Sequence, residues 1–310
     1  MLLAALDVGG TKTDAVLFDE TGHILCRSVT AGANPLDCGL EEACKRYENS
    51  IRALGIGADT PIDALYAGIA CYDYFGGSIG ERIKEMVTCR HLTAEGDGPC
   101  LLYGMLGEAD GAALICGTGS SLTLRVGGKV RYIGGCGWLV DGCSSGYILG
   151  RDALNRAVKM NDGRIGYTPM KELIEKRLGG ELISHLSQVY AGGRAYIASL
   201  CGVVFEALDM GDPYAEEIVD GCVKEMCLMI HAAAESFGKP FPLVLNGGVI
   251  RHFPEYEKRL RAAADPRAQM IMGTVPPVYG GAFAAARAAG LACGEEFHRR
   301  FMTDYDAMAN

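Results

Sequence analysis

The chain has 310 residues, of which 49% are hydrophobic and 22% are charged, as in a globular protein long enough for two domains. A net charge of −9 argues against a nucleic-acid partner, which needs a basic surface. No apolar run reaches the roughly 18 residues of a membrane span, and the short apolar start lacks the basic segment of a signal peptide. The thirteen scattered cysteines form no C-x-x-C pair, which favours a reducing cytoplasm over a disulfide framework.

The first third of the chain predicts three short strands joined by turns, followed by alternating helices and strands. Apolar runs on both sides of Gly9 and Gly10 predict a strand before this turn and a strand after it. A helix is expected to begin at Pro99, because proline suits the first helical turn. The predicted elements are strands at 3–6, 15–18 and 24–29, a helix at 40–54, a strand at 62–69, a helix at 80–87, a strand end at 92–95 and a helix at 100–106.

The pattern of three turn-linked strands occurs a second time, about one hundred residues later. A Gly-rich stretch at 134–146 follows the repeat, and the chain is then mostly helical. Asp212 and Pro213 predict the start of a long helix, and Gly238 predicts its end after Phe237. The other predicted elements are strands at 113–116, 122–126, 129–133 and 243–246, a helix at 282–289, and a helical or frayed tail at 293–310.

A pattern repeated in this way predicts an α/β protein with two similar domains and a cleft between them. The expected boundaries are residues 1–110 and 111–310, with the last helix able to pack back on the first domain. Ligands bind preferentially at such domain interfaces. The sequence therefore predicts that both Gly-rich turns serve one ligand.

The first turn has the composition of a phosphate-binding loop. Glycines and hydroxyls let an anion approach backbone N–H groups without steric obstruction. Asp7, at the end of the preceding strand, would hold Mg²⁺ through water. An ordinary hairpin turn is the alternative interpretation. The residues predicted to surround the phosphates are Gly9, Gly10, Thr11, Lys12 and Thr13.

The second turn occupies the matching place in the repeat, which favours phosphate binding at both. It contains Gly117, Thr118, Gly119 and Ser120. Neither turn is a Walker A loop, because no G-x-x-x-x-G-K-[ST] sequence is present. Neither is a dinucleotide fingerprint, because a strand follows each turn where that motif has a helix. Together the two turns predict an ATP-dependent enzyme.

Three further segments are candidates for ligand contacts. Gly247 and Gly248 end a buried strand, where adenine or ribose could approach the backbone; a plain strand-to-helix turn is the alternative. Asp97, between two glycines, could accept a hydroxyl proton during phosphoryl transfer, although the local sequence alone favours an Asp-Gly surface turn. Asn34 could bind a polyol or only shape a turn. A zinc site at Cys136 and Cys143 is not favoured, since no further ligand lies nearby.

From about Leu2 to Gly290 the segment order resembles the actin/hexokinase/Hsp70 ATPase superfamily. Within it, the chain is similar to the N-acetylglucosamine kinase branch of the BadF/BadG/BcrA/BcrD-type ATPases. This resemblance implies two ribonuclease H-like (actin-like ATPase) domains. Segments 7–13 and 117–120 are similar to the family's two phosphate motifs, and 246–249 to its adenosine motif.

The resemblance also implies substrate residues. Asn34 matches an asparagine that contacts the amino sugar, and Asp97 matches the family's catalytic base, with Gly96 in place of the family's asparagine. Thr118 matches a threonine between phosphate and sugar. The sugar-side loop would contain Gly137 and Trp138, and for Trp138 core packing remains an alternative.

Two departures from the family pattern bear on the substrate. The family's Gly-Asp-Glu-Gly-Ser-Gly is replaced by the segment from Asp141 to Gly146, in which Asp141 is displaced and Cys143 stands in place of the glutamate. Asp141 could still reach a sugar hydroxyl. Ala70 and Cys71 stand where these kinases tend to carry Ser-Gly against the sugar.

The predicted function is therefore an ATP- and Mg²⁺-dependent cytoplasmic kinase, expected as a homodimer, that phosphorylates the primary hydroxyl of an amino sugar of the N-acetylglucosamine or glucosamine class. Asp97 would take the hydroxyl proton. The first alternative is an activator-type ATPase that drives a partner enzyme, because Cys116 precedes Gly117 as a cluster cysteine precedes a similar loop in such proteins. The second is a non-catalytic sensor or repressor, which the missing helix-turn-helix and zinc signature disfavour.

Overall fold

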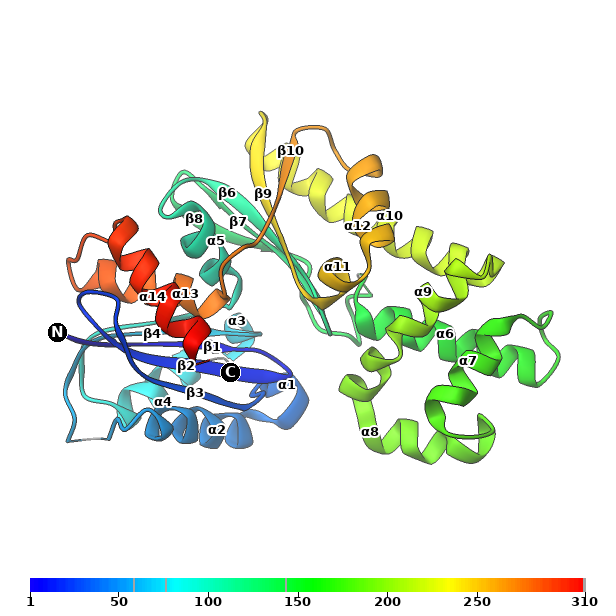
Figure 1. Ribbon diagram of the computed structural model, residues 1–310, viewed down its shortest axis with the longest axis horizontal. Coiled ribbons are helices and arrows are strands. Elements are labelled where there is room, and N and C mark those ends of the chain that lie inside the picture. Colours follow the sequence, from blue (N-terminus) through cyan, green and yellow to red (C-terminus); the bar gives the residue numbers. More distant parts are fainter. Residues whose placement is uncertain (58, 76, 143, 309–310) are drawn as a thin grey trace. The chain divides into compact units, whose positions relative to one another are not determined.

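The computed structural model describes residues 1–57, 59–75, 77–142 and 144–308, and the chain forms two compact units (Figure 1). The first unit contains Met1–Ala113, Gly127–Val130 and Gly273–Asn310. The second contains Leu114–Val126 and Arg131–Met272. The last forty or so residues thus group with the start of the chain.

A five-stranded sheet in the order β3-β2-β1-β4-β5 organises the first unit. Strands β1 and β2 are antiparallel, as are β2 and β3, whereas β1, β4 and β5 run parallel. Parallel strands end at the same edge of a sheet, so the ends of β1, β4 and β5 lie together. The strands are β1 (Leu2–Val8), β2 (Lys12–Asp19), β3 (Ile24–Ala31), β4 (Ile62–Ile69) and β5 (Cys89–Glu95).

Helices cover both faces of this sheet (Figure 1). Because side chains alternate along a strand, Ala4 and Leu6 face α2 and α4, whereas Leu3 and Ala5 face α13 and α14. The last two helices therefore complete the core of the first unit. Its helices are α1 (Pro35–Cys38), α2 (Leu40–Ala53), α3 (Tyr72–Phe75), α4 (Gly77–Met86), α5 (Gly98–Leu106), α13 (Pro277–Ala288) and α14 (Glu295–Ala307).

A buried ion pair fastens α14 to the sheet. Arg27 donates two hydrogen bonds to the Asp14 carboxylate at 3.0 and 2.9 Å, and Tyr305 on α14 donates a third at 2.6 Å. The Arg27 guanidinium also stacks 3.8 Å from the centre of the Tyr305 ring. The predicted helical tail is thus an ordered part of the first unit.

The second sheet repeats the strand order of the first, as β10-β9-β6-β7-β8. In both sheets the order is third, second, first, fourth and fifth strand of the repeat. This duplication confirms the mixed α/β fold with two similar halves that the repeated pattern predicted. The strands are β6 (Gly111–Cys116), β7 (Ser120–Val126), β8 (Lys129–Ile133), β9 (Phe241–Asn246) and β10 (Ala268–Met272).

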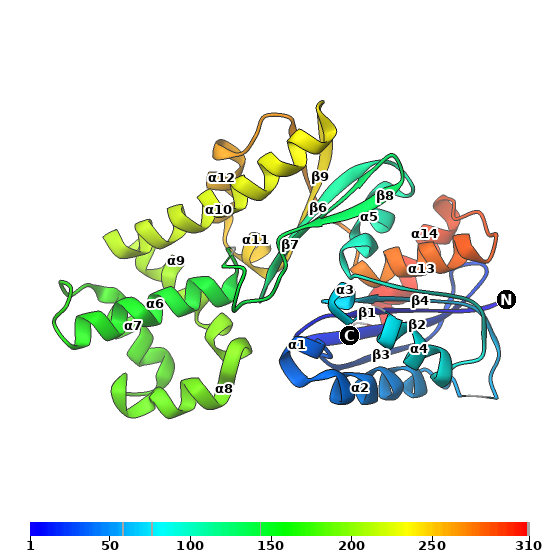
Figure 2. The ribbon, with the colours of Figure 1, turned by 180° about the vertical axis from the view of Figure 1, so that it is seen from behind.

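Most of the second unit beyond its sheet is helical, and α10 and α12 lie side by side (Figure 2). The predicted limits of α10 are confirmed: Asp212 accepts hydrogen bonds from Tyr214 N and Ala215 N, and Gly238 closes the helix at φ 64°. The helices are α6 (Gly146–Asn161), α7 (Pro169–Leu178), η1 (Ile183–His185), α8 (Leu186–Ser199), α9 (Cys201–Asp209), α10 (Pro213–Phe237), α11 (Gly248–His252) and α12 (Pro254–Ala263).

Two predicted helix starts were too late. Helix α13 begins at Pro277, five residues before the predicted 282, because proline at the first helical position needs no hydrogen-bond donor. Helix α4 begins at Gly77 instead of 80.

In the described part of the chain no single helix combines the length and apolarity of a membrane span; Pro169–Ser199 and Cys201–Asp209 meet those criteria only jointly, across a 54° bend.

Candidate functional site

The turn between β1 and β2 is held by its own carbonyl groups. Gly9 O accepts a hydrogen bond from Ala33 N, Thr11 O accepts one from Gly32 N, and Lys12 O accepts one from Gly9 N. In a trans peptide the next N–H points away from the preceding C=O, and the described residues contain no cis peptide. The amides of Gly10, Lys12 and Thr13 therefore point away from the groups that anchor the turn.

Of the side chains predicted to contact phosphate here, two are exposed and one is not. Thr11 and Lys12 lie on the surface of the turn, and Lys12 Nζ is 4.0 Å from Asp14. Thr13 is fully buried, and its hydroxyl donates to Ala31 O at 3.2 Å. It lies on the same face of β2 as Ala15, which packs in the core beside α2. This placement does not support a phosphate contact through the Thr13 hydroxyl.

Asp7 and Asp97 flank the same glycine. Asp7 in β1 pairs with Gly68 in β4, and a methyl group on Gly68 would lie 3.5 Å from the Asp97 Cα. The same methyl group would also lie 2.4 Å from Cys100 Sγ, so only glycine fits there. The sequence reasoning missed Gly68, because its neighbours depend on how β4 packs against α5.

Both carboxyl groups have raised pKa values. The pKa of Asp7 is raised to about 8, mainly by burial and also by the charges of Asp97 and Asp14, whereas Lys12 lowers it. Burial also raises the pKa of Asp97 to about 6, against the lowering effect of the backbone N–H groups of Asp97 and Gly98. A pKa near neutrality suits a group that accepts a proton and releases it again.

The region around Asp7 fits a hydrated divalent cation. Burial and the charges of Asp97 and Asp14 raise the pKa of Asp7, and a cation beside Asp7 would favour its ionised form. The described residues contain no cluster of three His, Cys, Asp or Glu able to hold a metal alone. Mg²⁺ does not need one, because it commonly binds through one or two carboxylates, substrate phosphates and water.

Asn34 lies against the first turn. A methyl group on Gly10 would lie 3.9 Å from the Asn34 Cβ, and a methyl group on Gly32 would collide with Gly10 O at 2.2 Å. Asn34 is buried and caps α1, where its Oδ1 accepts a hydrogen bond from Leu36 N. This cap uses the side-chain oxygen of Asn34 and not its amide nitrogen.

In the second unit, the turn between β6 and β7 is held in the same way as the first. Gly117 O accepts a hydrogen bond from Gly146 N, Thr118 O accepts one from Tyr147 N, and Gly119 O accepts one from Gly117 N. The amides of Thr118 and Gly119 therefore point away from the start of α6. Such successive N–H groups form a concave anion site.

The predicted adenosine segment lies next to this turn. A methyl group on Gly117 would lie 3.9 Å from Gly248 N, and one on Gly247 would lie 2.2 Å from Cys116 O. Gly247 also has φ 108°, a conformation that L side chains rarely adopt. The second unit therefore brings together two glycine segments that are 130 residues apart in the sequence.

The Gly-rich loop after β8 is held by Asp141. Its carboxylate accepts a hydrogen bond from Cys136 N at 3.0 Å, and its own N–H donates to Gly137 O at 3.0 Å. Trp138 is 39% exposed, and its ring centre is 5.3 Å from that of Tyr147. Trp138 is thus a partly anchored surface side chain. Cys143 lies outside the described residues.

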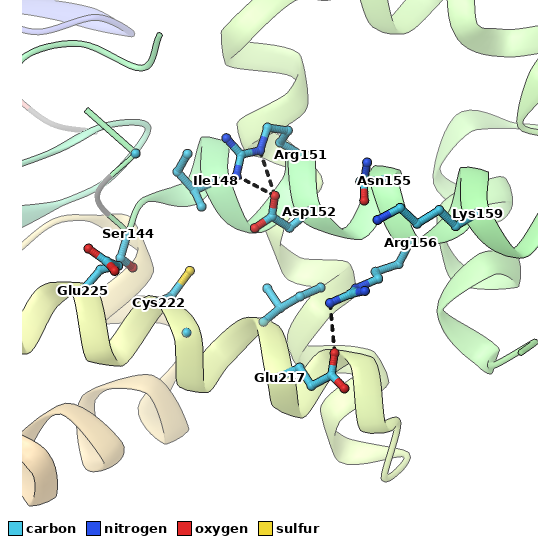
Figure 3. Close-up of a pocket in the computed structure, with 13 residues that line it drawn as sticks. Ser144, Ile148, Arg151, Asp152, Asn155, Arg156, Lys159, Glu217, Cys222 and Glu225 are labelled. Atoms are coloured by element: carbon cyan, nitrogen blue, oxygen red, sulfur yellow. Dashed lines mark hydrogen bonds and ion pairs between the residues drawn. The ribbon is translucent and has the colours of Figure 1, made fainter. Parts of the chain in front are cut away.

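A pocket of about 360 Å³ lies between α6 and α10 (Figure 3). Two of its arginines are paired with acids, Arg151 with Asp152 at 2.7 Å and Arg156 with Glu217 at 2.9 Å. The residues that line it include none of those predicted to bind phosphate. It is a charge-balanced groove separate from the glycine turns of the second unit.

Known proteins resemble the chain over most of its length. It is 24% identical to the N-acetyl-D-glucosamine kinase of Dictyostelium discoideum, over 92% of this chain and 97% of that protein. It is 27% identical to an N-acetylmuramic acid/N-acetylglucosamine kinase of Clostridium acetobutylicum, over 82% and 89%. Among solved structures, a candidate N-acetylglucosamine kinase from Chromobacterium violaceum superposes with a TM-score of 0.73 at 22% identity, over 92% and 98%.

A second solved structure shares the fold alone. A ROK family glucokinase from Streptomyces griseus, in complex with glucose and AMPPNP, has a TM-score of 0.57 at 19% identity, over 94% of this chain and 99% of that one. A model of the BadF/BadG/BcrA/BcrD ATPase family matches residues 6–286. The family predicted from the glycine motifs is confirmed: the chain belongs to the BadF/BadG/BcrA/BcrD ATPase family.

Proposed function

We propose that this ATPase-family protein transfers the γ-phosphate of ATP to the primary hydroxyl of an amino sugar, of the N-acetylglucosamine or glucosamine class. The observation that carries the proposal is the arrangement of Asp7, Gly68 and Asp97, which brings to one edge of the sheet two carboxyl groups whose raised pKa values suit cation binding and proton transfer. Curated relatives over most of the chain are amino-sugar kinases, which supports this substrate class. We propose two actin-like ATPase domains. Their predicted limits were 1–110 and 111–310, and we assign the residues from Gly273 onward to the first domain, because they group with the first unit.

Asp97 is the proposed base. Its carboxylate accepts the proton of the attacking hydroxyl while the oxygen bonds to the γ-phosphorus and the bond to the ADP oxygen breaks. A positioned base contributes about 10²- to 10⁴-fold to such a reaction. Its pKa of about 6 keeps most of the carboxylate ionised at pH 7, yet basic enough to accept a proton.

Asp7 is the proposed ligand of Mg²⁺, through water. When bound, the ion neutralises negative charge on the transferred phosphoryl group and on the leaving group. Burial raises the pKa of Asp7, the charges of Asp97 and Asp14 add to the rise, and a cation would offset these charges. Lys12 adds a second positive charge at the same turn, on an exposed side chain.

The glycine segments are the proposed nucleotide contacts. In the first unit these are Gly9, Gly10, Thr11 and Lys12, of which Gly10 and Lys12 have amides that face away from the anchored carbonyls. In the second unit they are residues 117–120, through the amides of Thr118 and Gly119, with Gly247 and Gly248 beside the adenosine. Backbone N–H groups aimed at phosphate stabilise its charge without reorganising during the reaction.

Sugar contacts are proposed for residues of each unit. Asn34 offers an amide nitrogen, and Thr118 a hydroxyl between phosphate and sugar. Gly137 and Trp138 present a backbone edge and an indole surface, and Asp141 holds their loop in place. We further propose that the Asp141 carboxylate accepts a hydrogen bond from a sugar hydroxyl.

A coupled ADP-release assay over a panel of amino sugars and hexoses tests the function. We expect ADP release that depends on an amino sugar and matches the amount of sugar phosphate formed. ADP release of equal rate with and without every sugar would contradict the proposal. Asp97→Asn, assayed in parallel, should lose the sugar-dependent rate and retain ATP binding.

The activator-type alternative has little support in the structure. In that alternative, Cys116 would ligate an iron–sulfur cluster shared between two subunits. Cys116 is fully buried in β6, and its thiol donates a weak hydrogen bond to Ser144 O. Burial also raises the pKa of this thiol, whereas a metal ligand must be a thiolate.

We also propose that the protein is a cytoplasmic homodimer. The described cysteines are free thiols, which suits a reducing compartment. The dimer is an implication of the family resemblance, and sedimentation velocity over a range of protein concentrations tests it. A single species of 32.9 kDa at all concentrations would contradict it.

A further inference from the structure

An arginine of the second unit lies against the turn that we assign to the nucleotide phosphates. A methyl group on Gly119 would lie 2.6 Å from Nη2 of Arg194, and 3.8 Å from its Cζ. The guanidinium thus occupies the space that a side chain at residue 119 would fill. The sequence analysis did not single out Arg194, because it lies 75 residues from this turn.

A break in α8 places this arginine. Gly193 has φ 58° and ψ −153°, so α8 is interrupted directly before Arg194. Only glycine adopts this conformation without strain. The pair Gly192–Gly193 inside a helical segment was the available sequence signal, since a glycine there lowers helix stability without an evident gain.

The part of α8 that follows the break is fixed to α6. A methyl group on Gly150 would lie 1.9 Å from Ile197 O, and one on Gly146 would lie 3.4 Å from Ala198 O. Gly146 N in turn donates to Gly117 O. The turn, the start of α6 and the second half of α8 therefore form one packed assembly, and Arg194 begins that half.

We propose that Arg194 binds the phosphates of the nucleotide held at the turn formed by residues 117–120. The amides of Thr118 and Gly119 point away from α6, and the Arg194 guanidinium adds the full positive charge that these partial charges lack. Arginine suits this role because its planar, always charged group can donate two parallel hydrogen bonds to phosphate. The inference rests on nucleotide binding at this turn and is independent of the sugar.

Calorimetric titration of the whole protein with ADP and Mg²⁺, in the absence of sugar, tests the proposal. We expect Arg194→Met to weaken ADP binding by about 10- to 100-fold and Arg194→Lys to weaken it less. Adenosine should bind both variants as it binds the unchanged protein, because it carries no phosphate. A binding constant for ADP within twofold of the unchanged protein would overturn the proposal.

The matched control is Arg177→Met. Arg177 belongs to the same unit and is paired with Glu206 at 3.1 Å on the surface, so its removal changes the net charge equally. ADP binding by this variant should be unchanged. If Arg177→Met weakened ADP binding as much as Arg194→Met, the effect would be general electrostatics and the proposed contact would be wrong.

A double-mutant cycle links Arg194 to the turn. The φ of Gly119 lies outside the left-handed region, so Gly119→Ala is compatible with the backbone and should only displace the guanidinium. We expect the double variant to bind ADP no more weakly than Arg194→Met alone. Fully additive losses would show that Gly119 and Arg194 act separately, which overturns the assignment. A sugar kinase assay that fails for every sugar leaves these ADP measurements unaffected.

Discussion

The charge of Asp97 raises the pKa of Asp7, although ninety residues separate them in the sequence. The parallel pairing of β1, β4 and β5 causes this, because it places the ends of these strands at one edge, with Gly68 between the two acids. One acid with a pKa of about 6 and another with a pKa of about 8 have separate roles at neutral pH. The first is ionised and can accept a proton, whereas the second favours a cation.

Replacing Asp97 by asparagine should lower kcat at least about a hundredfold, because asparagine cannot accept the hydroxyl proton. KM for ATP should change little, since ATP contacts are proposed elsewhere. Steady-state kinetics with a saturating amino sugar measures both.

The folded state binds the Asp97 proton more tightly than the unfolded state, so this residue's stabilising contribution is present below about pH 4 and lost as the pH rises through about 6.

It follows that Asp97→Asn should be at least as stable as the unchanged protein at pH 8. A Tm well below that of the unchanged protein would mean that lost structure, not a lost base, explains the lower activity. Near-normal turnover in a stable variant would remove Asp97 from the mechanism.

The rate should depend on pH through the same group. We expect kcat/KM to fall about tenfold per unit as the pH drops below about 6, since protonated Asp97 cannot act as a base. The charge of Asp73 contributes to the raised pKa of Asp97, so Asp73→Asn should move this limb to lower pH by a few tenths of a unit. A pH profile unchanged from pH 7 to pH 5 would contradict the assignment.

Replacing Asp7 by asparagine should raise the Mg²⁺ concentration needed for half-maximal activity by about 10-fold or more, because a neutral amide binds a cation less strongly than a carboxylate. Mg²⁺ titrations at fixed ATP measure this. The control is Asp63→Asn, which removes an acid at the opposite end of β4, where its carboxylate accepts a hydrogen bond from Leu2 N. Equal Mg²⁺ requirements in the Asp7 variant and the unchanged protein would exclude Asp7 as a ligand.

The repeated strand and turn pattern was sufficient to predict both sheets, because the alternation of apolar residues and the glycine turns are local signals. Both glycine turns and the capped helix α10 were predicted for the same reason. The parts that were missed are set by packing. Thr13 looks like a phosphate ligand in the sequence, yet the face of β2 on which it lies is covered by α2.

Gly68 and Arg194 illustrate the same limit. The reason for glycine at residue 68 is the thiol of Cys100, and nothing in the sequence around Gly68 indicates that neighbour. The position of Arg194 depends on the packing of α8 on α6 at Gly150. Such long-range packing follows from how the elements assemble, which a single sequence does not encode as a local pattern.

Cys71 has φ 62°. Among the described residues other than glycine, it alone has a positive φ. It stands where the resembling kinases tend to have glycine. The left-handed conformation costs about 1–2 kcal/mol for most residues and little for glycine. We therefore expect Cys71→Gly to be more stable than Cys71→Ala by about 1 kcal/mol, the reverse of the usual order. Urea unfolding of the two variants measures the difference, and an alanine variant of equal or higher stability would contradict it.

The buried pair of Asp14 and Arg27 should make α14 essential for stability. Asp14→Asn leaves the Arg27 charge without its acid in a position where both side chains are less than a tenth exposed, which should cost about 3–5 kcal/mol. Tyr305→Phe removes one hydrogen bond to a charged group and should cost about 1.5–3 kcal/mol. The control is Glu296→Gln on the same helix, whose partner Arg299 is exposed, and its effect should stay below about 1 kcal/mol. Urea unfolding separates the three; an Asp14 variant as stable as the control would show that α14 is held by its apolar contacts alone.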